Sequence, residues 1–209
     1  MRPGNLKFKT VFIIEDKIPL EEFSHMIYTQ IYPVFRSKMR HPEDITNRNN
    51  LYPIIQHAKM IWMSEAISLN PFQSQTFFWI DAGFSRFIKK EEQYTRPFPA
   101  LNKVNMLIAQ EQMIIAVGEA NKKDLDVKSP LNMEDVLGTN KAFFQGKFFG
   151  GYKNTVYQLA TGTLSNFFLA LSNHMIDNEQ ITMFLTYRQH PTLWFLRESN
   201  KAFDFMADP

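Results

Sequence analysis

Short apolar runs rich in β-branched and aromatic residues alternate along this chain with longer segments in which apolar side chains recur at helical spacing. The short runs predict strands at residues 6–14, 74–81 and 192–196. The helically spaced segments predict helices at residues 19–35, 52–71, 155–176 and 177–190. Strands that alternate with helices favour an α/β layer fold with at least partly parallel pairing, and we expect a single domain over residues 1–209.

Four segments have a less regular pattern. The expected strand at 74–81 lacks alternation, and its continuous hydrophobicity predicts burial on both faces, as in the middle of an α/β sheet. Residues 88–104 are polar and contain two prolines, which predicts a surface excursion. Residues 106–120 fit a strand or a helix equally well. Residues 141–154 predict two short aromatic pieces around glycines.

The composition narrows the class of protein. Apolar residues make up 44% of the 209 positions and include 20 Phe, which is enough to bury a sizeable core. The 23 basic and 21 acidic residues leave a net charge of +2, which argues against a dedicated nucleic-acid binder. The chain has no cysteine, so disulfides, thiolate metal sites and cysteine nucleophiles are excluded. No apolar stretch reaches the roughly 18 residues that span a bilayer, so we expect a cytoplasmic protein without a transmembrane segment.

The first candidate for chemistry is Asp81, the single acid in "FFWIDAGFSRF" at residues 77–87. It ends an expected strand, and the ligands of open α/β sheets bind where strands end. A carboxylate there can hold a divalent metal, and Ala82 and Gly83 would let a ligand approach closely. An aspartate that caps the turn after the strand explains the pattern equally well.

Two later stretches and one lysine are further candidates. "FFGGY" at residues 148–152 has adjacent glycines, which permit a turn or the close approach of a ligand. "DNEQ" at residues 177–180 resembles a capping box, in which Asp177 caps the following helix. The carboxylates of Asp177 and Glu179 could also orient or deprotonate a hydroxyl. Lys59, in the preceding long helix, reaches either solvent or a phosphate above the sheet edge.

Several common signatures are missing from the sequence. The histidines show no HExxH spacing, and the chain contains neither GxSxG nor GxxxxGK[ST]. The stretch "AVGEAN" is not a Gly-rich dinucleotide fingerprint. The sequence therefore lacks the residues that would identify a serine hydrolase, a P-loop protein or a Rossmann dehydrogenase.

Taken in order, "YPIIQHAKMIWMSEAISLNPFQSQTFFWIDAGFSRF", "FFGGY" and "DNEQ" resemble the HtrL/YibB family, also called WlaTC/HtrL. The resemblance covers residues 7–196, and "NPF" followed by "FFWIDAG" is its most specific block. Members of this family are glycosyltransferase-like proteins, many of them encoded among bacterial surface-polysaccharide genes. The resemblance implies a GT-A-like nucleotide-diphospho-sugar transferase fold, with a mixed, mostly parallel central sheet flanked by helices.

By this resemblance the chain moves a sugar from a nucleotide-sugar donor to a glycan or glycolipid acceptor. Asp177 and Glu179 would be catalytic and would face the reacting sugar and the acceptor hydroxyl. Asp81 would also bind Mn²⁺ or Mg²⁺ against the donor diphosphate. The residues implied to contact substrate are Lys59, Asp81, Gly83, Arg86, Gly150, Gly151 and Gln180.

Two departures from the GT-A pattern favour an alternative function. The usual metal motif is Asp-x-Asp, but Gly83 stands where the second acid is expected. The strand expected at 6–14 corresponds to the second strand of a GT-A fold, so the first βα unit is expected to be missing. The alternative is a truncated or degenerate relic that binds a glycan or a protein without catalysis.

Overall fold

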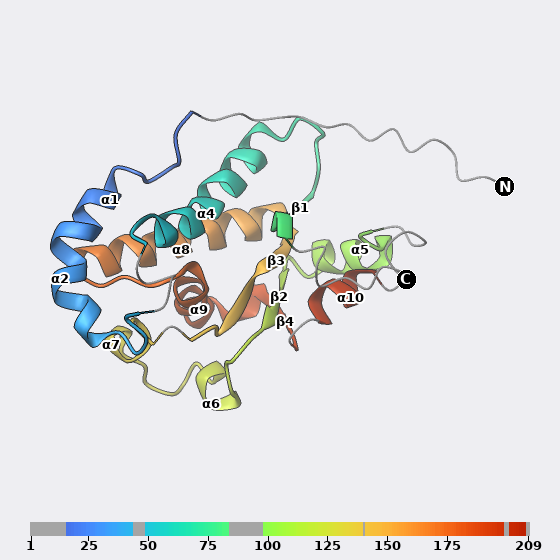
Figure 1. Ribbon diagram of the computed structural model, residues 1–209. Coiled ribbons are helices and arrows are strands. Elements are labelled where there is room, and N and C mark those ends of the chain that lie inside the picture. Colours follow the sequence, from blue (N-terminus) through green and yellow to red (C-terminus); the bar gives the residue numbers. More distant parts are fainter. Residues whose placement is uncertain (1–15, 44–48, 84–97, 140, 199–200, 208–209) are drawn as a thin grey trace.

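The computed structural model describes residues 16–43, 49–83, 98–139, 141–198 and 201–207. The strand expected at residues 6–14, and its place as the second strand of a GT-A pattern, lie outside these ranges. The described elements form a four-stranded sheet with helices on both faces, which confirms the α/β class (Figure 1).

The sheet has the strand order β1-β3-β2-β4. Its strands are β1 (Thr76–Ile80), β2 (Met113–Val117), β3 (Phe144–Tyr152) and β4 (Trp194–Arg197). β3 is antiparallel to both β1 and β2, whereas β2 and β4 are parallel. The prediction of a mostly parallel sheet is therefore wrong. A parallel connection needs a long crossover, usually a helix, but the described part of the segment between β2 and β3 carries only two four-residue helices.

The helices confirm the four predicted helical segments and add others. The helical elements are α1 (Phe23–Met26), the π-helical turn η1 (Ile27–Ile31), α2 (Tyr32–Phe35), the 3-10 turn η2 (Arg36–Lys38), α4 (Leu51–Leu69), α5 (Leu101–Ala109), α6 (Lys122–Leu125), α7 (Met133–Val136), α8 (Lys153–Ser172), α9 (Glu179–Gln189), the 3-10 turn η4 (Pro191–Leu193) and α10 (Lys201–Ala207). Part of the expected surface excursion is helix α5, and the sequence did not predict α10. None of these helices is long and apolar enough to cross a membrane.

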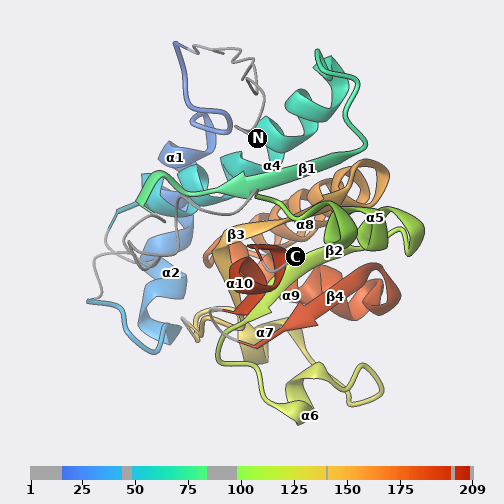
Figure 2. The ribbon, with the colours of Figure 1, turned by 90° about the vertical axis from the view of Figure 1, so that its right-hand side faces the viewer.

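Two apolar cores lie on opposite faces of the sheet. On one face α4, α8 and α9 cover side chains such as Ile115 and Phe149. On the other face α5 and α10 cover Ile114 and Phe148, and Figure 2 views the sheet from this side. Each strand therefore supplies side chains to both cores.

β1 is an edge strand of the described sheet, not the central strand that its hydrophobicity predicted. Its side chains are only half-buried between Thr76 and Trp79. The continuous hydrophobicity arises because alternate side chains face different cores. Phe77 and Trp79 pack toward the core under α4 and α8, and Phe78 packs toward the core under α5 and α10.

β3 is one continuous strand of nine residues, where the sequence predicted two pieces around glycines. Gly150 and Gly151 lie within its ladder and have φ values of 152° and 155°. A Cβ atom on Gly150 would lie 2.2 Å from the carbonyl oxygen of Phe77, and one on Gly151 would lie 2.4 Å from that of Gln112. The glycines permit the close approach of both neighbouring strands, so the turn interpretation of "FFGGY" is wrong.

Replacing Gly150 with alanine is expected to lower the free energy of unfolding by about 1–3 kcal/mol, the usual cost of overpacking. The added methyl group would meet the backbone of β1, including Phe78 Cα at 2.5 Å, which cannot move aside without breaking strand pairing. Urea unfolding monitored by circular dichroism measures the loss. A change below about 0.5 kcal/mol, the usual range for surface substitutions, would show that β1 yields to the methyl group.

Candidate functional site

The candidate site lies at the edge of the sheet where β1, β2 and β4 end. These three strands run in one direction, because β1 and β2 are both antiparallel to β3 and β4 is parallel to β2. Asp81 directly follows β1, and its backbone N–H donates to the carbonyl oxygen of Lys147 at 2.9 Å. The predicted placement of Asp81 at the carboxyl end of a strand is therefore confirmed.

β3 is irregular at this edge. On β2, Ile115 pairs with residue 149 of β3, but the next residue, Ala116, pairs with residue 145. Residues 146–148 bulge out of the ladder with β2, and bulges are common next to functional sites. The Gly146 carbonyl oxygen accepts a hydrogen bond from Lys59 Nζ at 3.3 Å.

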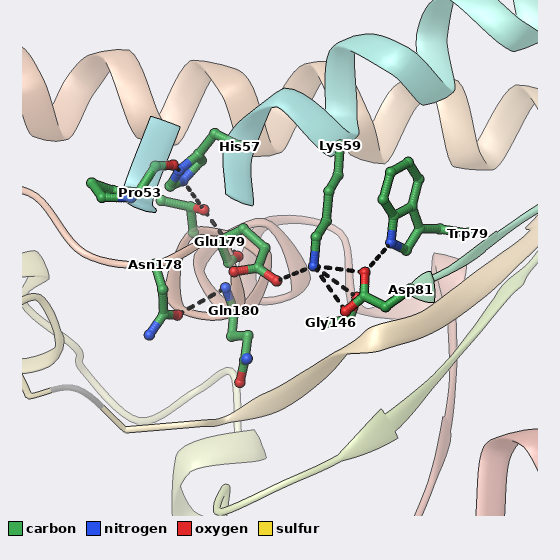
Figure 3. Close-up of polar contacts among 10 residues, drawn as sticks. Pro53, His57, Lys59, Trp79, Asp81, Gly146, Asn178, Glu179 and Gln180 are labelled. Carbon is green, nitrogen blue, oxygen red and sulfur yellow. Dashed lines mark hydrogen bonds and ion pairs between the residues drawn. The ribbon is translucent and has the colours of Figure 1, made fainter. Parts of the chain in front are cut away.

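Lys59 is the centre of the site, and its side chain reaches the sheet edge from the middle of α4 (Figure 3). Its Nζ lies 3.2 Å and 3.4 Å from the two carboxylate oxygens of Asp81. It lies 3.0 Å from Oε1 of Glu179. Because the Lys59 side chain is only 6% exposed, it does not extend into solvent, which was one of the two outcomes expected for it.

Asp81 is the member of this site that solvent reaches. Its side chain is 35% exposed, whereas that of Glu179 is 1% exposed. The indole Nε1 of Trp79 donates to Asp81 Oδ1 at 2.6 Å, and the Trp79 ring stacks on Trp62 with 6.1 Å between ring centroids. An indole and an ammonium group therefore hold the Asp81 carboxylate from two sides.

Glu179 enters the site from the first residue of α9. Asn178 caps this helix by accepting the Gln180 backbone N–H at 3.0 Å. A carboxylate in the first turn is favourable because backbone N–H groups and the helix dipole place positive charge there. Burial raises the pKa of the Glu179 carboxyl above its usual value, and the Lys59 ammonium opposes part of that rise.

The two carboxylate oxygens of Glu179 differ in their contacts. Oε1 contacts Lys59, but Oε2 is buried and has no hydrogen-bond donor among the described residues. Buried polar atoms are nearly always paired, so one without a donor calls for an explanation. Within the described part of the chain, this oxygen is therefore an acceptor that no hydrogen bond to another residue uses.

Gly146 makes room for the Glu179 carboxylate. A Cβ atom at this position would lie 2.1 Å from Glu179 Oε1, so a larger residue would displace the carboxylate from Lys59. No pattern in the sequence indicates this role, because a single glycine between Gln145 and Lys147 is not distinctive. The space that Gly146 leaves depends on the packing of α9 against β3, which is a tertiary property.

His57, two residues before Lys59 in α4, links this helix to α9. Its ring nitrogens lie 2.6 Å from the Pro53 carbonyl oxygen and 2.8 Å from Thr182 Oγ1. The Thr182 hydroxyl in turn donates to the Glu179 carbonyl oxygen at 3.0 Å. Complete burial is the main cause that lowers the pKa of His57 from 6.5 to about 4, so the ring is neutral in the folded protein at pH 7.

Acid is expected to destabilise the fold through His57. The unfolded chain binds a proton at this residue below about pH 6.5, whereas the folded protein does so only below about pH 4. Stability is therefore complete above pH 6.5 and falls as the pH drops from 6.5 to 4. From pH 7 to pH 5 the expected contribution of His57 to this loss is about 2 kcal/mol.

Urea unfolding of the wild type and of a His57→Gln variant, at pH 7 and at pH 5, measures this contribution. An equal acid loss in the variant would remove His57 as the cause.

None of the contacts described for Asp177 involves Lys59, Asp81 or Glu179. Its carboxylate accepts the Gly138 backbone N–H at 2.7 Å and the Asn178 backbone N–H at 2.7 Å. The prediction that Asp177 caps the next helix is wrong, because Asn178 is the capping residue. Asp177 instead holds the turn after α7, and its catalytic role stays a prediction from the resemblance.

The other predicted site residues lie at different places. Gly83 lies two residues after Asp81, in 3-10 conformation, and Arg86 lies outside the described residues. Gly150 and Gly151 are further along β3, inside the ladder. The Gln180 side chain points away from Lys59 (Figure 3). The site thus unites Lys59, Asp81 and Glu179 from the predicted set and adds Trp79 and Gly146.

The described residues do not fit a divalent metal at Asp81 as they stand. No group of three or more His, Asp or Glu side chains suited to a metal occurs among them. Both oxygens of Asp81 already contact the Lys59 ammonium, which would repel a second cation at that place. Binding of Mn²⁺ or Mg²⁺ by Asp81 stays a prediction from the resemblance, and no chemical step below depends on it.

Comparison with known proteins adds one finding. The model of a family described as "Bacterial protein of unknown function (HtrL_YibB)" matches residues 7–207. No curated protein matches the chain, and no solved structure matches it. The match covers almost the whole chain and includes every residue of the site around Lys59.

Proposed function

The chain belongs to the HtrL_YibB family, and from this premise we propose that it is a glycosyltransferase. It would move a sugar from a nucleotide-sugar donor to a glycan or glycolipid acceptor, as in the synthesis of surface polysaccharides. The single observation that carries the proposal is the convergence of Lys59, Asp81 and Glu179 at the carboxyl edge of the sheet. In open α/β sheets ligands bind outside the carboxyl ends of the strands, and β1, β2 and β4 all end at this place.

The chemistry of the three side chains suits the transfer of a sugar to a hydroxyl group. In this reaction the acceptor oxygen forms a bond to the anomeric carbon, and the bond from that carbon to the diphosphate oxygen breaks. The nucleoside diphosphate leaves with the electron pair of the broken bond. The acceptor hydroxyl must also lose its proton, which a carboxylate with a raised pKa accepts efficiently near neutral pH.

We assign to Glu179 the role of the base that accepts the proton of the acceptor hydroxyl. Its Oε2 has no hydrogen-bond donor among the described residues. Burial raises the pKa of this carboxyl, which makes it a stronger base than an exposed glutamate. Asp81 is the exposed carboxylate, so the acceptor would meet it first and would be oriented by it. The proposal requires that the acceptor hydroxyl enters past Asp81 to reach Glu179.

The same region also favours a second candidate, a glycan-binding protein without catalysis. Lys59 is occupied by oxygen atoms of the protein itself, which leaves this ammonium no free position for a donor phosphate. The stacked rings of Trp79 and Trp62 beside the Asp81 carboxylate combine an apolar ring face with a hydrogen-bond acceptor. A sugar offers the complementary surfaces, namely C–H groups on its face and hydroxyl groups at its rim.

Binding of nucleoside diphosphates separates the two candidates. If the chain is a transferase, UDP or GDP at millimolar concentration should raise the melting temperature by several degrees, because a ligand stabilises the fold that binds it. The Asp81→Asn variant should bind an oligosaccharide acceptor more weakly, because it lacks the carboxylate that orients the acceptor, and Lys122→Ala, a change at an exposed lysine, should not. No shift with any nucleoside diphosphate, together with a shift on adding oligosaccharides, would support the glycan-binding protein.

A further inference from the structure

We propose that the Lys59 ammonium is a built-in cation that takes the place of a divalent metal ion between Asp81 and Glu179. The inference goes beyond the transfer reaction, because it concerns the cation that organises the two carboxylates. It has a direct consequence. Removing the lysine side chain should convert this place into a site for a divalent cation such as Mg²⁺, Ca²⁺ or Mn²⁺.

The ligands around the ammonium are those that a hard cation prefers. Divalent calcium and magnesium bind carboxylate and backbone carbonyl oxygens. Lys59 Nζ is surrounded by two oxygens of Asp81, one of Glu179 and the carbonyl of Gly146, all at 3.0–3.4 Å. These groups come from the end of β1, the bulge of β3 and the start of α9, so the fold brings them to a single point (Figure 3).

The number of acceptors exceeds what a lysine can satisfy. An ammonium group has three N–H donors, whereas four oxygen atoms lie within 3.4 Å of Nζ. The fifth oxygen nearby, Glu179 Oε2, is buried without a donor in the described part of the chain. Calcium, for example, takes six or more oxygen ligands and can bind both oxygens of one carboxylate. It would therefore use the oxygen that Lys59 leaves unpaired.

The charges lead to the same conclusion. One ammonium carries a single positive charge against two carboxylates, so the three groups together are negative whenever both acids are ionised. Burial makes such an unbalanced charge costly, and the Glu179 side chain is only 1% exposed. A divalent ion would neutralise both carboxylates. It cannot bind while Lys59 stands between them, because like charges repel strongly at this short range.

The test uses the full chain, with no sugar donor, so its outcome is independent of the transferase proposal. The melting temperature of the wild-type protein should change by less than about 1 °C with EDTA or with 10 mM Mg²⁺, Ca²⁺ or Mn²⁺. Lys59→Ala should melt about 10 °C lower in EDTA, the size of shift expected when a buried ion pair loses one partner. At least one of the three ions should raise its melting temperature by about 5 °C, as for a ligand well above its dissociation constant.

Two control variants assign the effect to this site. The double variant Lys59→Ala, Glu179→Gln should lose the rescue, because glutamine supplies one neutral oxygen in place of a carboxylate. Lys59→Met keeps the volume of the stem and should show no rescue, because the methionine side chain fills the space. Failure of all three ions to stabilise Lys59→Ala would overturn the proposal.

The wild-type protein gives a second measurement that does not depend on the folding of any variant. Titration with Mn²⁺, followed by the electron paramagnetic resonance signal of free Mn²⁺, should detect no site with a dissociation constant below about 1 mM, a weak-binding limit for protein calcium sites. A tighter site that disappears in Asp81→Asn, a change at a partly exposed side chain, would overturn the proposal. Such a result would instead restore the metal predicted at Asp81.

Discussion

Replacing Lys59 with methionine is expected to lower the free energy of unfolding by about 3–5 kcal/mol, the usual cost of leaving one member of a buried ion pair without its partner. Methionine keeps most of the length of the side chain but removes its charge. Glu179 would then be a carboxylate that is 1% exposed and has no cation, so it must take up a proton or remain charged at high cost. The loss of the contact with Asp81 contributes less, because that side chain is about a third exposed.

A double-mutant cycle shows whether this loss belongs to the Lys59–Glu179 pair. Glu179→Gln removes the buried negative charge, so Lys59→Met should cost markedly less in the Glu179→Gln background than in the wild type. Groups in direct contact typically show interaction energies of 0.5–3 kcal/mol in such cycles. Urea unfolding of the four proteins gives the number. If the two single losses simply add, the ion pair does not hold α4 to α9.

Glu179→Gln is expected to lower the rate of sugar transfer by about 10²–10⁴-fold, the usual contribution of a general base. Glutamine has nearly the shape of glutamate and can still accept a hydrogen bond from Lys59, but it cannot take the proton of the acceptor hydroxyl. The binding of the nucleotide sugar should change little, because the assigned role of Glu179 lies in the proton transfer. Measured turnover and donor affinity together therefore separate a catalytic role from a binding role.

Asp177 provides a matched control for this variant. Its carboxylate contacts the Gly138 and Asn178 backbone N–H groups, so Asp177→Asn should act mainly on stability. Turnover at a temperature well below unfolding should stay within about threefold of the wild type for Asp177→Asn. A loss for Asp177→Asn as large as that for Glu179→Gln would return Asp177 to the catalytic machinery, as the family resemblance first implied.

The sequence predicted elements more reliably than their pairing. The long helices α4, α8 and α9 follow from apolar spacing, and β1 and β4 follow from short apolar runs. Strand direction is different, because it depends on the route of the chain between strands. Where the structure describes it, the segment before β3 forms only four-residue helices, and the strand returns antiparallel. Alternate side chains of β1 face two cores, a pattern that looks the same in sequence as burial in the middle of a sheet.

The site was predictable where position along a strand or helix determined it. Asp81 lies at the end of β1, as its place after an apolar run indicated. The sequence could not show that Lys59, 120 positions before Glu179, forms an ion pair with it. That contact requires the packing of α4 against α9 through His57 and Thr182, and the space left by Gly146. The motif "DNEQ" contains two acids, and only one of them enters the site. Glu179 does so because α9 begins at this residue, whereas Asp177 lies before the helix and contacts Gly138.

The assignment of this site to sugar transfer is tested by measuring the release of nucleoside diphosphate from a panel of nucleotide sugars, with mixed bacterial surface glycans as acceptors. We expect acceptor-dependent release by the wild-type protein with at least one donor, a loss of about 10²-fold or more in Glu179→Gln, and normal rates in Lys122→Ala. Release that is equal in the wild type and Glu179→Gln, or no release from any donor by a protein that binds glycans, would contradict the assignment of this site to sugar transfer.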